Sequence, residues 1–109
     1  RSLSLRRNRV DDVSALKNMT RMNWLELNDN RVPSVAPLAG MTALEKLYLE
    51  NNRVTELAPL VNLKVLRELQ ARGNDISNEQ SSLLIKALPD CRIHAGVFST
   101  IPTRKPKNK

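Results

Sequence analysis

A spacing of 22 residues recurs along this chain and limits the folds that it can adopt. It is marked by a column of asparagines, namely Asn8, Asn30, Asn52 and Asn74. Apolar residues keep a fixed offset from each asparagine, with two at alternate positions ahead of it and one two residues behind it. A segment of this length can form one short strand and a return path, but it cannot enclose its own apolar side chains. Neighbouring repeats must therefore stack, and the spacing predicts a solenoid.

The alternation ahead of each asparagine is typical of a β-strand. We expect parallel strands near residues 3–5, 25–27, 47–49, 69–71 and 91–93, joined in one sheet on the concave side. Prolines in the short return segments disfavour long helices, so we expect extended or short 3₁₀ pieces on the convex side. The asparagine column is interpreted as structural, because stacked side-chain amides can satisfy backbone groups that turn inward.

A different pattern follows the fourth repeat. Ser77 and Gln80 have the spacing of a capping box, an apolar stripe follows them, and Pro89 ends it, which predicts a helix near residues 78–88. Continuing the 22-residue register places Cys91 in a core leucine column of a last strand. We expect this helix and strand to close one end of the core.

The chain thus divides into three predicted segments. Residues 1–76 hold about four coils, residues 77–100 hold the closing helix and strand, and residues 101–109 form a basic tail that we expect to be flexible. No capping element precedes Leu3. We therefore expect the first coil to fray or to associate end to end with another copy, and the parent protein to be longer.

Two consecutive repeats share one motif, which reads Leu25-x-Leu27-x-x-Asn30-x-Val32 and then Leu47-x-Leu49-x-x-Asn52-x-Val54. Each is followed by Ala-Pro-Leu, and together they resemble the leucine-rich repeat family, most closely its internalin class. The resemblance covers residues 3 to about 76. It implies a right-handed α/β repeat solenoid that binds a protein ligand on its concave sheet, and it favours the bacterial surface or secretion over an intracellular location. Ala71 departs from the leucine consensus, which predicts a thinner core at the fourth strand.

The sequence holds few groups suited to catalysis. His94 is the only histidine and is expected to face outward, while Cys91, the only cysteine, is expected to be a buried and inert thiol. The glycines are scattered singly and form no phosphate-binding loop. We therefore predict a non-enzymatic protein without catalytic residues, a metal site or a cofactor.

The net charge of +7 raises nucleic acid or an anionic surface as possible partners. The excess is concentrated at the two ends, in Arg1, Arg6, Arg7 and Arg9 and in Arg104, Lys105, Lys107 and Lys109. Between them, residues 10–100 carry ten basic and eleven acidic residues, so the body has no basic excess. Binding through the basic ends is therefore kept as an alternative, with a structural spacer in a larger protein as a third. Arg9, Arg31 and Arg53 are interpreted as a solvated row.

The outward positions of the strands carry the prediction about function. Trp24 and Tyr48 are the only tryptophan and tyrosine, and both fall on this surface on adjacent strands, as diagonal neighbours. Large aromatic residues anchor protein interfaces, and mixed charge around them favours a protein partner over a polyanion. The predicted partner-binding residues are Trp24, Glu26, Lys46, Tyr48, Glu50, Glu68, Gln70 and Arg72. In the same register, the last strand would add Asp90, Arg92 and His94.

Overall fold

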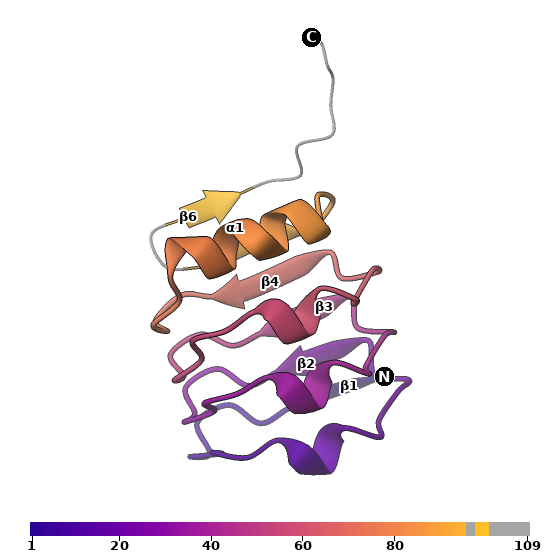
Figure 1. Cartoon of the computed structure of the whole chain (residues 1–109). Helices are drawn as coiled ribbons and strands as arrows, with labels where there is room; N and C mark the ends of the chain where they lie inside the picture. The colour runs from indigo at the N-terminus through magenta and orange to yellow at the C-terminus, as the bar shows by residue number, and fades with distance from the viewer. Residues whose placement is uncertain (96–97, 101–109) are drawn as a thin grey trace, which may run out of the picture.

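The computed structural model describes residues 1–95 and 98–100. Within these residues, six strands form one sheet in the order of the sequence. Figure 1 shows the coils stacked one on another from the N-terminus to β6. The strands are β1 (Ser2–Ser4), β2 (Trp24–Glu26), β3 (Lys46–Tyr48), β4 (Glu68–Ala71), β5 (Arg92–Ala95) and β6 (Phe98–Thr100). Strands β1 to β5 are parallel, which confirms the predicted solenoid sheet, and β6 returns antiparallel to β5. The sequence pattern did not predict β6, and the basic tail lies outside the described residues.

The return side of the coils carries short 3₁₀ turns, as predicted, although the first of them contains no proline. These are η1 (Ser14–Leu16), η2 (Ala36–Leu38) and η3 (Ala58–Leu60). Figure 1 shows them stacked opposite the sheet, with the helix α1 (Asn78–Ala87) continuing the stack. The core lies between these two layers, where Leu25, Leu47 and Leu69 are fully buried. In the first coil, by contrast, Leu3 and Leu5 are only half-buried, because a neighbouring coil covers them on one side alone.

The last coil is longer than the others, which corrects one prediction. Leu25 pairs with Leu47, and Leu47 with Leu69, at the expected spacing of 22 residues. Leu69, however, pairs with Ile93, a spacing of 24 residues. The cause is α1, a helix of 10 residues in the place of a 3₁₀ turn of three residues, which uses a longer stretch of chain. Cys91 consequently precedes β5, and Ile93 occupies the core leucine column instead.

The start of α1 also differs in part from its predicted cap. Ser77 Oγ accepts a hydrogen bond from the Gln80 backbone N–H at 3.2 Å, as a capping box requires. The Gln80 side chain does not complete the box, because its Oε1 accepts from the Leu57 N–H at 2.9 Å. Gln80 thus joins the closing helix to the preceding coil instead of completing the cap.

The asparagine column is built as predicted at Asn30, Asn52 and Asn74, whose side-chain amides join successive coils, whereas Asn8 is exposed and its Nδ2 donates to the Arg6 carbonyl of its own coil. Asn52 Nδ2 donates to the Leu27 carbonyl of the preceding coil and to the Leu49 carbonyl of its own coil, both at 2.9 Å. Its Oδ1 accepts from the Val32 N–H at 3.0 Å. Asn30 and Asn74 repeat this arrangement. Each amide therefore satisfies backbone groups that the sheet leaves behind at the turn.

A second column, directly before the asparagines, was not found from the sequence. Its members have positive φ angles: 60° at Arg7, 63° at Asp29, 60° at Asn51 and 82° at Gly73. Asn51 Nδ2 donates to Asp29 Oδ1 at 2.8 Å, so this turn is also tied from coil to coil. Asp, Asn and Gly tolerate this left-handed conformation, whereas Arg7, in the first coil, is not of a type that favours it. The members of the column share no common hydropathy, so a repeat of apolar residues does not reveal them.

Replacing Asn52 by alanine should lower the free energy of unfolding by about 1–3 kcal/mol, because backbone groups of two coils lose their partner in a buried turn. Urea denaturation followed by circular dichroism measures the change. Asn62→Ala, at an exposed position, is the matched control and should have little effect. Equal stabilities of the two variants would show that the amide column does not hold the coils together.

Gly73→Ala should destabilise the protein by about 1–3 kcal/mol, because alanine is strained at a positive φ and its β-carbon would clash with Asn51. The added atom would clash with Asn51 Oδ1 and would lie 2.9 Å from the Asn51 backbone nitrogen, at a φ of +82°. Gly40→Ala is the control, since nothing lies within 4 Å of its added β-carbon. Thermal denaturation should separate the two variants, and a normal melting temperature for Gly73→Ala would contradict the strained turn.

Candidate functional site

The solvent-facing side of the sheet presents two columns of side chains, which we call the sheet face. The first column contains Ser2, Trp24, Lys46, Glu68 and Arg92. The second contains Ser4, Glu26, Tyr48, Gln70 and His94. Asn28, Glu50 and Arg72 follow the ends of the strands. The predicted site residues therefore all lie on or beside this face, but the longer last coil moves the β5 residues by one step.

The predicted columns are therefore wrong at β5. Arg92 pairs with Glu68 and enters the first column, where Asp90 was predicted. His94 pairs with Gln70 and enters the second column, where Arg92 was predicted. Asp90 precedes β5 instead. A positive side chain thus replaces a negative one at the end of the first column.

The aromatic pair lies at the predicted place. The ring centroids of Trp24 and Tyr48 are 5.5 Å apart and the ring planes make an angle of 61°. This edge-to-face geometry is favourable for aromatic rings. Direct register pairs Trp24 with Lys46 and Glu26 with Tyr48, so the two rings meet across the diagonal. Both side chains stay partly exposed.

The acidic residues around the aromatic pair already make contacts within the protein, through the carboxylate in Glu26 and Glu68 and through the backbone in Glu50. Glu26 accepts a hydrogen bond from Ser4 Oγ at 2.9 Å and forms an ion pair with Arg6 at 3.5 Å. Glu68 accepts from Gln70 Nε2 at 2.8 Å. The Glu50 backbone N–H donates to Asn28 Oδ1 at 2.7 Å. The face therefore combines one aromatic pair with charged groups of both signs.

A hollow of about 400 Å³ opens at the start of strands β3 to β5. Its lining residues are Lys46, Arg67, Glu68, Asp90 and Arg92. Arg67 forms a long ion pair of 3.9 Å with the exposed Glu45. Arg67 was not among the predicted site residues, because it lies just before β4 and outside the alternating strand positions. Arg92 lines the hollow because the last coil is two residues longer than the others and brings Arg92 beside Glu68. The 22-residue spacing does not predict this position.

Reactive chemistry has little support in the described residues. No group of three or more His, Cys, Asp or Glu side chains gathers there as a metal site would require. Cys91 is 2% exposed, which confirms the predicted buried thiol. Burial, with a smaller contribution from the charge of Glu68, raises the pKa of this thiol to about 12. A thiol with this pKa is a poor nucleophile at neutral pH.

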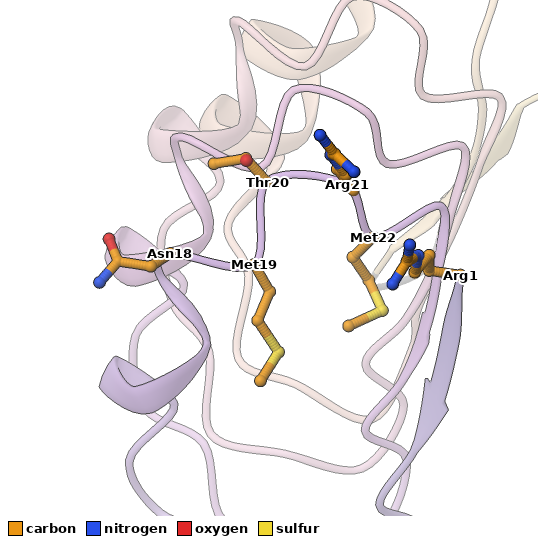
Figure 2. Close-up of a pocket in the computed structure, with 6 residues that line it drawn as sticks. All are labelled: Arg1, Asn18, Met19, Thr20, Arg21 and Met22. Atoms are coloured by element: carbon orange, nitrogen blue, oxygen red, sulfur yellow. The ribbon is translucent and has the colours of Figure 1, made fainter.

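A second hollow, of about 410 Å³, lies in the first coil. Figure 2 shows Met19 and Met22 extending into the space inside this coil, whereas Asn18 points away from it. Met19 is 44% exposed, whereas Met22 is buried, with 7% exposure. No helix in the described part of the chain is long and apolar enough to cross a membrane.

Comparisons with known proteins agree with this architecture. The family described as Leucine Rich repeats (2 copies) matches residues 20–62. An internalin (inlF) of Listeria monocytogenes superposes with a TM-score of 0.81 and 22% identity, over 91% of this chain and 35% of that protein. Internalin C2 (inlC2) of the same species superposes with a TM-score of 0.74 and 33% identity, over 82% of this chain and 39% of that protein.

A leucine-rich repeat protein of Leptospira interrogans superposes with a TM-score of 0.68 and 24% identity, over 82% of this chain and 22% of that protein. The chain thus spans between about a fifth and two fifths of the length of these solved structures. A comparison with curated protein sequences finds no match.

The Cys91 thiol should react with a thiol-specific reagent at least about tenfold more slowly in the native protein than in the unfolded chain, because burial blocks access to the sulfur and raises its pKa to about 12, which leaves little thiolate. Absorbance after mixing with a disulfide reagent, with and without urea, measures the two rates. Equal rates would show that the thiol is accessible and that the last coil opens readily.

Proposed function

Because this chain is a leucine-rich repeat protein with internalin-like coils, we propose that it is a non-enzymatic recognition module that binds a protein partner on its sheet face. The observation that carries the proposal is the edge-to-face pair of Trp24 and Tyr48 on that face. Only 3% of the residues are aromatic, and these two rings stay outside the aliphatic core. A partner would cover apolar ring surface that the fold leaves exposed.

Energetic considerations support this role for the two rings. Tryptophan and tyrosine are enriched among the residues that contribute most to binding, because they bury much apolar area at a small cost in side-chain entropy. The rings are held against each other on rigid strands, so little further ordering is needed when a partner binds. The surrounding residues form a polar rim that excludes water from the anchor, and they are Glu26, Lys46, Glu50, Glu68, Gln70 and Arg72.

The mixed charge of the rim supports a protein partner rather than a nucleic acid. Nucleic-acid surfaces require a continuous basic field, whereas this face mixes both signs, with Lys46, Glu68 and Arg92 alternating along the first column. In the first coil, Arg6 pairs with Glu26, and Arg7 lies 3.9 Å from Asp29. Two of the basic residues at the amino-terminal end therefore have acidic neighbours, which weakens the case for an anionic surface.

Truncating both rings in a Trp24→Ala, Tyr48→Ala variant should weaken partner binding by about 2 kcal/mol or more while the fold stays intact, because neither ring belongs to the core. The measurement is affinity capture from an extract of the source organism or its host, followed by titration of the captured protein. The control is a Val65→Ala, Leu83→Ala variant, which removes exposed apolar side chains away from the sheet face.

Equal recovery of the partner by wild type and the ring variant would contradict the proposal. If deletion of residues 101–109 abolished recovery in that experiment, binding through the basic ends would replace it. Circular dichroism of every variant checks that the solenoid is intact.

A further inference from the structure

We propose that the hollow beside the aromatic pair accepts a carboxylate of the partner, and that the sheet face therefore selects an acidic segment in which Asp or Glu follows a large apolar residue. This inference rests on the proposed function and specifies the chemistry of its ligand. The carboxylate would lie between Lys46 and Arg92, while the apolar side chain covers Trp24 and Tyr48.

Two cations of the hollow flank Glu68 but are not held in ion pairs within the described part of the chain. Lys46 and Arg92 are exposed, line the same hollow and form no ion pair with any residue that the structure describes. Glu68 stands between them in the register of the sheet. Its carboxylate is instead hydrogen-bonded by Gln70 Nε2 at 2.8 Å, toward the second column. The two cationic groups are therefore available to a carboxylate from outside.

The acidic residues of the hollow do not favour a basic ligand there. They are Glu68 and Asp90. Glu68 has a cation on each neighbouring strand and a hydrogen bond from Gln70, and Asp90 already has an interaction of its own. A third cation, Arg67, also lines the hollow. A basic side chain would meet these three cations, whereas a carboxylate would be attracted by them.

The geometry of the sheet sets the spacing of the ligand residues. The aromatic pair lies across β2 and β3, and the hollow is centred near β4, because Lys46 and Arg92 are on the strands on either side of it. Strands are about 4.8 Å apart, so the two centres are separated by roughly 7 Å. An extended peptide advances about 3.3 Å per residue and places residues i and i+2 on one side. The apolar residue and the acid should therefore be two residues apart.

Selection of random linear peptides displayed on phage tests the inference while the natural partner is still unidentified. On the wild-type protein we expect enrichment of peptides that carry Asp or Glu two residues from Trp, Phe or Leu. A Lys46→Gln, Arg92→Gln variant should keep the apolar preference and lose the acidic one. The matched control, Arg31→Gln with Arg53→Gln, makes the same charge change at exposed turn positions and should select as wild type does.

The enriched peptide is then titrated by fluorescence. Trp24 is the only tryptophan, so its emission reports on the sheet face itself. The Lys46→Gln, Arg92→Gln variant should bind the peptide about tenfold more weakly than the control variant, and its affinity should depend less on salt. Replacing the acid in the peptide by its amide should reduce affinity for wild type and leave that of the variant unchanged.

The outcomes separate this inference from the proposed function. Apolar peptides enriched without an acid would overturn the carboxylate site and leave the aromatic anchor supported. No enrichment, or peptides that bind a Trp24→Ala, Tyr48→Ala variant as tightly as wild type, would overturn both. Enrichment of basic peptides that depends on Lys46 and Arg92 would show that the sign of the ligand charge is wrong.

Discussion

The structure depends on the hydrogen bonds that asparagine side chains make at the turn after each strand. Where the chain leaves the sheet it turns toward the core, and its carbonyl and N–H groups lose the partners that a sheet provides. Asn52 replaces those partners for two coils at once, through Leu27, Leu49 and Val32. Leaving such groups unpaired in a buried turn would offset much of the gain from burying the leucines. The apolar stack and the amide column are therefore required together.

Structure was predictable from the sequence wherever it follows from a repeated residue type. Leucine and asparagine columns indicated the coil length, the sheet direction and the register of β1 to β4, and this register correctly placed Trp24 beside Tyr48. The prediction failed in the last coil, because a helix and a 3₁₀ turn need different lengths of chain to cover the same layer. The column of positive φ angles was also missed, since its members share a backbone conformation rather than a hydropathy.

The irregular last coil affects one part of the candidate site and leaves the other part as predicted. The aromatic pair lies within the regular coils, and all eight residues predicted for binding lie on or beside the sheet face. The hollow is formed partly by the irregular coil, so the position of Arg92 could be found only from the structure. Arg67 was also missed, because it lies one residue before β4. The alternation of inward and outward side chains applies only within a strand and does not predict where Arg67 lies. The charge pattern of the proposed ligand site is thus less predictable than the position of the sheet face.

The asparagine column also has a direction. Asn30 Oδ1 accepts from the N–H groups of Asn8 and Val10, and its Nδ2 donates to the Leu5 carbonyl, so each turn is completed by the coil that follows it. A ribosome delivers the coils in this same order. A turn that has just emerged keeps water as its partner until the next asparagine, 22 residues later, arrives to replace it. The growing end of a nascent solenoid is therefore its least ordered coil, and each newly made repeat completes the one before it.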